Sequence, residues 1–182
     1  MKLMNACKLF GLLTALATPG LGNAQQTLTL TVTGVLVGGT CDVNALDRLQ
    51  DIDLYPVTVA ALVSAPGQSY RPKPFFIRLE NCAPGLRNAK FSFNGMPDEH
   101  ESSQWANTHA RPAPNVALHI ERSDTNVVIS PFSVDPRTHS IAIDSVSRTA
   151  TFAGNVSYWR KNTGAPGEGG VTGQTVFTID YD

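Results

Sequence analysis

The clearest pattern of hydrophobic and polar positions lies close to the N-terminus, over residues 27–37. Apolar side chains and threonines alternate there, and Gly38 and Gly39 follow directly. A period of two residues with threonines on the wet side predicts a half-buried β-strand. The two glycines predict a flexible joint after it. The apolar face of this strand comprises Leu28, Leu30, Val32, Gly34 and Leu36.

Most of the remaining chain also consists of short alternating runs separated by turn residues. Pro-Gly and Asn-Gly pairs between the runs predict tight turns. Residues 59–64 have the pattern of a short turn of helix, and residues 97–114 form the longest stretch without a strand pattern. Six or seven short strands at regular spacing predict an all-β fold, an antiparallel sandwich.

The first 24 residues have the pattern of a signal peptide. Lys2 and Lys8 are followed by an apolar run over residues 9–17, which is too short to cross a bilayer as a helix. Small residues at positions 22–24 suit a signal peptidase. We therefore expect export, with a mature chain that begins at Gln25, and we expect no membrane insertion later in the sequence.

Removal of the signal peptide changes the length, the charge and the cysteine count. Of 182 residues 158 remain, enough for one domain with a substantial core. Lys2 and Lys8 leave with the peptide, so 12 of the 14 basic residues face 15 acidic ones, a formal charge of −3. Such a weakly acidic surface has no electrostatic footprint for nucleic acid or anionic lipid.

Cys7 also leaves with the signal peptide, so Cys41 and Cys82 are the two cysteines of the mature chain. In an oxidising compartment two cysteines most simply form one disulfide. The separation of 41 residues would contribute roughly 4 kcal/mol in the chain-entropy model. Free thiols and metal ligands are the alternatives, although two cysteines alone make a weak zinc site.

The sequence contains no recognisable catalytic constellation. No Gly-x-Ser-x-Gly elbow occurs. His119 alternates with apolar neighbours, which predicts a solvent-facing position. His100 lies in the acidic segment 98–101, where a metal could bind, but an acidic surface loop is the plainer interpretation. We therefore predict no cofactor, no metal site and no enzymatic activity.

Several motifs occur together in an order that is typical of one family. They are Gly34 seven residues before Cys41, the run F-x-I-x-L-x-x-C at 75–82, FSFNG at 91–95, NVAL at 115–118, Gly169 fourteenth from the end, and VFTIDYD at 176–182. In these features the chain resembles the type 1 pilin family, the fimbrial subunits of chaperone–usher fimbriae. The resemblance covers nearly the whole mature chain.

The resemblance implies an incomplete immunoglobulin-like sandwich that is completed by a donor strand from another subunit. A periplasmic chaperone lends a strand during assembly, and the outer-membrane usher exchanges it for the N-terminal extension of the neighbouring pilin subunit. The implied organisation is a signal peptide at 1–24, a donor-strand extension at 25–39 and a pilin domain at 40–182. Burial of Leu28, Leu30, Val32 and Leu36 in a neighbour would contribute roughly 6–12 kcal/mol before ordering costs, with Gly34 where the groove is shallow.

The resemblance also assigns the C-terminal strand to the face that meets the chaperone and usher. Residues 174–181 would form one lip of the groove, and basic residues of the chaperone would hold the carboxylate of Asp182. The implied positions are Gly169, Val176, Phe177, Ile179, Tyr181 and Asp182. The acidic last residue and the glycine-rich run 164–173 depart from the family pattern and leave the shape of the groove's end open.

The implied function is architectural: a structural subunit that is exported through the periplasm to a surface fimbria and supports cell adhesion. One alternative is a receptor-binding minor tip subunit that uses loop 97–114 and Trp105, although Trp105 and Trp159 are more simply packing residues. A secreted enzyme is another, and a pocket holding two of His100, Glu101 and His109 would support it. The N-terminal strand could also complete its own sandwich.

Overall fold

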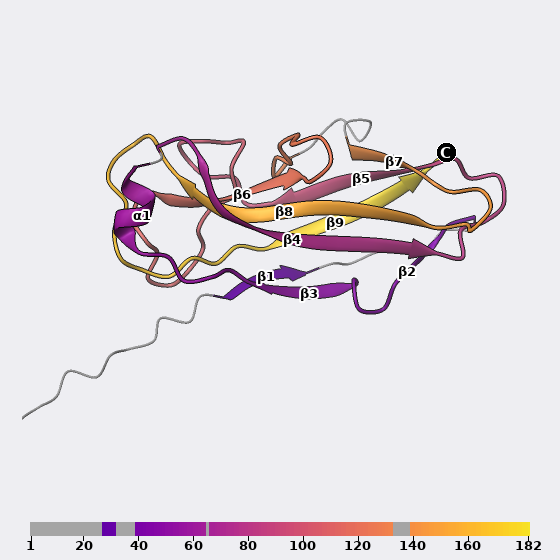
Figure 1. The fold of residues 1–182 in the computed structure, drawn as a ribbon, viewed down its shortest axis with the longest axis horizontal. Coiled ribbons are helices and arrows are strands. Elements are labelled where there is room, and N and C mark those ends of the chain that lie inside the picture. The colour runs from indigo at the N-terminus through magenta and orange to yellow at the C-terminus, as the bar shows by residue number, and fades with distance from the viewer. Residues whose placement is uncertain (1–26, 32–38, 65, 133–138) are drawn as a thin grey trace, which may run out of the picture.

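The structure is a computed structural model that describes residues 27–31, 39–64, 66–132 and 139–182. Figure 1 shows an elongated sandwich whose strands run along the long axis, with α1 at one end and β2 and the C-terminus at the other. The elements are β1 (Thr27–Thr31), β2 (Asp42–Val43), β3 (Leu49–Asp53), α1 (Val59–Val63), β4 (Ser69–Glu80), β5 (Asn88–Gly95), β6 (Val116–Arg122), β7 (Ser140–Ala142), β8 (Ala150–Arg160) and β9 (Thr175–Tyr181).

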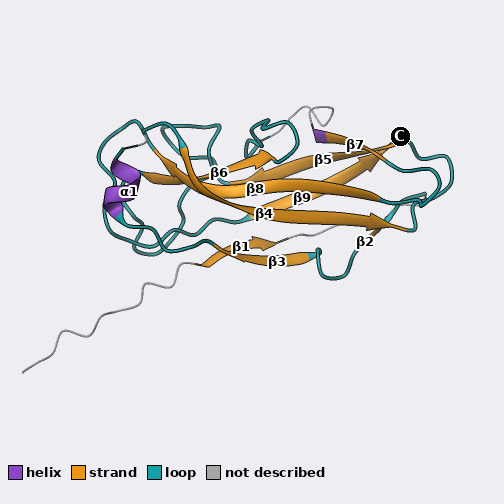
Figure 2. Ribbon diagram, viewed as in Figure 1, coloured by secondary structure: helices purple, strands orange, loops and turns teal. Residues whose placement is uncertain are grey.

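The strands form two main antiparallel sheets and one two-stranded ribbon. One sheet has the order β2-β4-β8-β6, the other the order β7-β5-β9, and β1 pairs with β3. Strands and loops make up nearly all of the described chain (Figure 2), which confirms the predicted all-β sandwich. The nine strands among the described residues exceed the six or seven predicted, because β2 and β7 are only two and three residues long.

The alternation read from the sequence places the core between the sheets. Phe75, Ile77 and Leu79 of β4 are buried, while the residues between them are exposed. Aromatic rings fill the centre: the ring centroid of Phe91 lies 4.6 Å from that of Phe152. Phe93 and Phe177 complete this cluster.

One turn of helix forms where the sequence predicted it. The hydroxyl of Thr58 accepts a hydrogen bond from the amide of Ala61 at 3.3 Å, which caps the N-terminus of α1. Among the described residues no helix is both long and apolar enough to span a bilayer.

Candidate strand-docking site

The sandwich has a strand edge beside β9. Within its sheet β9 pairs with β5 and has no second partner among the named strands of the described residues. An edge strand presents backbone N–H and C=O groups that can pair with another strand. β1 and β3 lie next to this edge, below β4 and β9 in the view of Figure 1.

β1 occupies the position beside this edge. It runs antiparallel to β3, from the pair Thr27–Asp53 to the pair Thr31–Leu49, and it also contacts β9. The predicted strand conformation is therefore confirmed over Thr27–Thr31, and its pairing partner belongs to the same chain. The side chains of Leu28 and Leu30 lie outside the described part of the structure. So do the predicted donor positions Val32, Gly34 and Leu36.

The C-terminal strand turns one face into the core and the other outward. Phe177 is fully buried, and Ile179 and Tyr181 are partly buried against the core. Val176 lies between buried neighbours and is half-buried on the opposite face. This strand is therefore anchored through Phe177.

The carboxylate of Asp182 is held within the chain. Its Oδ2 lies 2.5 Å from Nζ of Lys90, and its backbone oxygen accepts hydrogen bonds from the amides of Arg87 and Asn88. The hydrogen bond from Lys90 lowers the pKa of Asp182. The sequence pointed to a partner's basic residues at this position, and the structure adds Lys90 as an internal one.

A cavity of about 330 Å³ lies at the α1 end of the sandwich. It is bordered by residues that follow β3 and by residues that precede β9. It therefore lies beyond the α1 end of the space between those two strands. Gly169 forms part of its wall, and a Cβ atom there would lie 2.4 Å from the backbone nitrogen of Ala113. The lining residues are Val57, Thr58, Val59, Leu62, Ala113, Val116, Tyr158, Gly167, Glu168, Gly169 and Val171.

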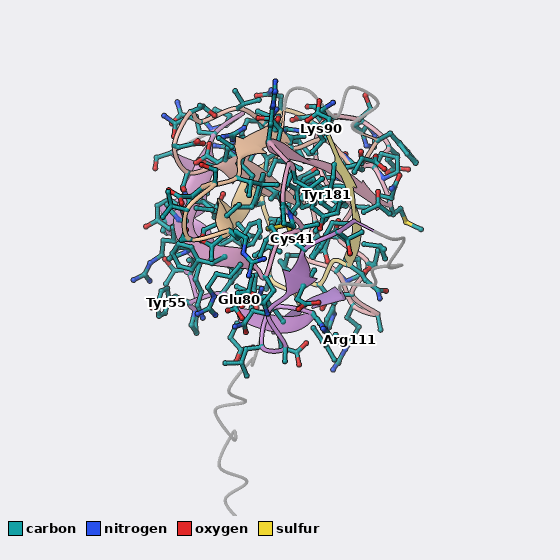
Figure 3. All side chains as sticks on the ribbon, turned by 90° about the vertical axis from the view of Figure 1, so that its right-hand side faces the viewer. Cys41, Tyr55, Glu80, Lys90, Arg111 and Tyr181 are labelled. Carbon is teal, nitrogen blue, oxygen red and sulfur yellow. A yellow bond between two sulfur atoms is a disulfide. The ribbon has the colours of Figure 1, made fainter. Side chains whose placement is uncertain are left out.

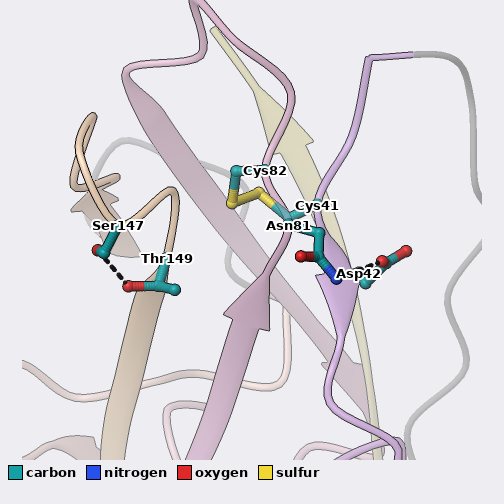
Figure 4. The surroundings of a disulfide bond; sticks show 6 residues. All are labelled: Cys41, Asp42, Asn81, Cys82, Ser147 and Thr149. Carbon is teal, nitrogen blue, oxygen red and sulfur yellow. Dashed lines mark hydrogen bonds between the residues drawn. A yellow bond between two sulfur atoms is a disulfide. The ribbon is translucent and has the colours of Figure 1, made fainter.

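The predicted disulfide between Cys41 and Cys82 is confirmed, and both cysteines are buried. It lies at the end opposite the cavity, where it ties the start of β2 to the end of β4 (Figure 4). Residues 25–39 join the folded body directly before this bond.

The prediction that His119 faces solvent is wrong. Its side chain is buried, because Gln104 of loop 97–114 and Trp159 of β8 pack against it. Its Nδ1 lies 2.8 Å from Oε1 of Gln104, its Nε2 lies 3.3 Å from Glu121, and its ring stacks on Trp159. Burial lowers the pKa of His119, and the carboxylate of Glu121 only partly offsets that effect.

The same loop contains the residues on which the alternative functions would depend. Trp105 is a packing residue, as predicted, because it is buried and its Nε1 donates to the carbonyl of Ile129 at 2.8 Å. It has no exposed face on which a ligand could stack. The described residues that line the cavity include none of His100, Glu101 and His109. No group of three or more His, Cys, Asp or Glu in the described part of the chain is placed to hold a metal ion.

Comparison with known proteins identifies relatives over most of this length. The laminin-binding fimbrial subunit ElfA of Escherichia coli O157:H7 is 29% identical over 161 residues, covering 87% of this chain and 86% of that protein. The fimbrial subunit ElfA of Escherichia coli strain K12 matches equally well.

Solved structures show the same fold. The P pilus rod subunit PapA superimposes with a TM-score of 0.61 at 17% identity, covering 78% of this chain and 99% of that one. A subunit of a chaperone–usher pilus gives a TM-score of 0.63 at 17% identity, covering 91% and 100%. The sandwich is therefore immunoglobulin-like in the manner of pilins. A profile of the fimbrial protein family matches residues 16–182, so this chain belongs to the fimbrial protein family and is a structural pilin.

Proposed function

We propose that this pilin polymerises by donating residues 27–37 to the next subunit of a surface fimbria. The observation that carries the proposal is the position of β1 between β3 and β9. β1 belongs to a segment that ends four residues before Cys41, and it pairs with β3 beside the edge at which β9 has no other named strand as partner in the described chain. When the extension leaves its own body, the same edge becomes available to the extension of another subunit.

The sequence of the extension suits this exchange. Its apolar face can be buried in a neighbour while its backbone pairs with β3 and β9 of that neighbour. This mode of recognition is strand addition, and pilin assembly is a known case of it. Pairing along the strand fixes the register, and the apolar side chains contribute the affinity. The cavity beside Gly169 lies at the end of this line and offers apolar surface to an incoming side chain.

The partners follow from this exchange. A periplasmic chaperone protects the edge of β9 before assembly, and an outer-membrane usher directs the exchange, so the chain passes through the periplasm to the surface. Val176, Ile179, Tyr181 and Asp182 belong to the C-terminal strand and its end, which the chaperone meets, with Phe177 as the anchor of this strand and Gly169 at the end of the groove. The chain performs no reaction and needs no cofactor. The assembled fibre supports adhesion, and laminin is one surface to test, since one relative is described as binding it.

The test changes one face of the extension at a time. Leu30→Asp places a charge on the face proposed to enter the neighbour, and Thr29→Asp places the same charge on the opposite face. Cells producing each variant with chaperone and usher are sheared, and the released material is examined by electron microscopy and by gel without boiling. We expect fibres from Thr29→Asp and only periplasmic monomer from Leu30→Asp.

Fibres of normal length and heat resistance from Leu30→Asp would contradict strand donation. Loss of fibres from both variants, with normal monomer levels, would mean that both faces of the extension are buried. The tip-subunit alternative predicts wild-type chains at fibre ends only, which immunogold labelling would reveal.

A further inference from the structure

Two cations and a tyrosine gather at the α1 end of the molecule. Cζ of Arg71 lies 5.4 Å from the centroid of the Tyr55 ring, and Nζ of Lys73 lies 5.3 Å from it. The ring is more than half exposed. Among the described residues neither cation lies within 4 Å of a carboxylate oxygen. The cluster of Tyr55, Arg71 and Lys73, the basic pole below, therefore makes no ion pair within the described chain.

The structure holds this basic pole in place. Arg71 donates from Nη1 to the carbonyl of Pro56, and Lys73 donates from Nζ to the carbonyl of Asp53. The hydroxyl of Tyr158 donates to the carbonyl of Tyr55 at 3.1 Å, which fixes the backbone under the ring. These contacts lie at the last residue of β3 or directly after it, beside the edge at which β1 pairs.

Two carboxylates lie together at the opposite end. Asp42 of β2 and Glu80 of β4 are directly opposite each other in the antiparallel ladder, and both are exposed. Each accepts a hydrogen bond from an asparagine, Asp42 from Asn81 at 3.2 Å and Glu80 from Asn44 at 2.7 Å. Neither lies within 4 Å of a cationic nitrogen in the described chain. Asp42 and Glu80, the acidic pole below, adjoin the disulfide in Figures 3 and 4.

The two carboxylates of the acidic pole repel each other in the isolated fold. Like charges directly opposite each other in a ladder are destabilising. Arg78 lies two residues before Glu80 on β4 and is attracted to it, but its bidentate ion pair is with Asp47. Lys73 and Glu80 are seven residues apart on β4, about 23 Å in an extended strand, so the two poles of one chain cannot meet.

Chain length brings the poles of two chains together. This step rests on the proposed function. If residues 27–37 lie in a neighbour, Val37 is joined to Cys41 by four residue steps, which span at most about 14 Å. The acidic pole directly follows Cys41, so it lies beside whichever end of the neighbour's edge receives Val37. We propose that this end is the basic pole, and that Asp42 and Glu80 of one subunit pair with Arg71 and Lys73 of the next.

The charges also choose the direction of the donated strand. If Val37 lay at the disulfide end of the neighbour, two acidic poles would be in contact and would repel. With Val37 at the α1 end, the donated strand runs parallel to β3, which is the reverse of β1 beside β3 in its own chain. Opposite charges then meet in a head-to-tail contact that repeats along a fibre. The pairs form at a tethered contact, where the effective concentration is high.

The test is a charge swap in assembled fibres. Lys73→Glu and Glu80→Lys each place like charges at every junction, whereas the double variant restores an opposite pair in reversed order. Subunit release from sheared fibres is followed in denaturant at low salt. We expect about two- to fivefold faster release in each single variant, the range for one exposed ion pair, and near wild-type release in the double variant. Glu99→Lys, an exposed loop change, is the control.

Two further measurements separate the causes. The melting temperature of the monomer should change little in the double variant, since the junction exists only in the polymer. Subunit release from wild-type fibres should accelerate with salt, and release from Lys73→Gln/Glu80→Gln fibres should accelerate less, because only Arg71 and Asp42 remain charged at the junction. If the wild-type chain forms no fibres, the proposed function fails and the junction with it. If wild-type fibres form but the double variant releases subunits as fast as the singles, the junction alone is refuted. Fibres that bind heparin as strongly per subunit as monomer does would show an uncovered basic pole and would also refute it.

Discussion

At the scale of single residues, the environments of His119 and Gly169 are set by tertiary packing that the local sequence does not reveal. His119 occupies an alternating run, yet Gln104 of loop 97–114 and Trp159 of β8 pack against it. Gly169 is a glycine because the backbone at Ala113 leaves no room for a side chain. Both depend on segments that are distant in sequence, so alternation along one strand could not predict either environment.

His119 makes the fold sensitive to mild acid. Burial lowers the pKa of His119 in the folded chain, so the unfolded chain binds a proton more readily as the pH falls below about 6.5. The contribution of neutral, buried His119 to the free energy of unfolding is fully present above that pH and is lost as the pH falls. Urea unfolding at pH 7.5 and pH 5.5 should show a smaller loss of stability in His119→Gln than in wild type. An unchanged loss would contradict this account, and His100→Gln, at an exposed site, is the control.

Substitution at Gly169 should cost stability although it adds only one methyl group. The Cβ of Gly169→Ala would lie 2.4 Å from the nitrogen of Ala113, so the backbone of one of the two segments must shift. We expect a loss of about 1–3 kcal/mol in the free energy of unfolding, the usual cost of overpacking. Glu168→Ala, at the exposed neighbouring position, should change little. Equal losses of stability in Gly169→Ala and Glu168→Ala, measured by denaturant titration, would show that the contact between residue 169 and the backbone of Ala113 is not tight.

At the scale of elements, the strands with clear alternation were predictable and the short ones were not. β4 and β5 follow directly from the spacing of Phe75, Ile77, Leu79, Phe91 and Phe93. β2 and β7 have too few residues to show a period, and tertiary pairing defines them. The sequence marked the extension and the C-terminal strand as partners in assembly. It gave no sign of the two charged poles, because these form only when β2, β4 and the segment after β3 are placed in space.

The turn between β2 and β3 is fixed by a buried carboxylate. Oδ2 of Asp47 accepts from the backbone amide and Nε of Arg78, and Oδ1 accepts from Nη2, each at 2.8 Å. Asp47→Asn keeps the size but loses the charge and one acceptor. We expect a loss of about 1–3 kcal/mol in the free energy of unfolding, measured by urea titration. Asp51→Asn, at an exposed position of β3, should be nearly neutral, and equal losses would contradict the role of Asp47.

At the scale of the whole molecule, the chain is a sandwich with a strand edge along one side and unlike charges at its two ends. The all-β architecture and the disulfide were predictable, because alternation and cysteine count are local or compositional signals. The assignment of the edge needed the fold, since β3, β9 and β1 come from both ends of the chain. The proposed function adds that this sandwich is complete only when a strand lies beside β9.

The most direct test of that statement is thermal unfolding of residues 38–182 with and without a synthetic peptide of residues 27–37. We predict a low melting temperature for the protein alone and a much higher one with the peptide, because the peptide restores the strand beside β3 and β9. The same peptide with Leu30→Asp should have little effect. A protein that is stable alone and indifferent to the peptide would mean that the sandwich is closed without the extension, and polymerisation by strand donation would be refuted.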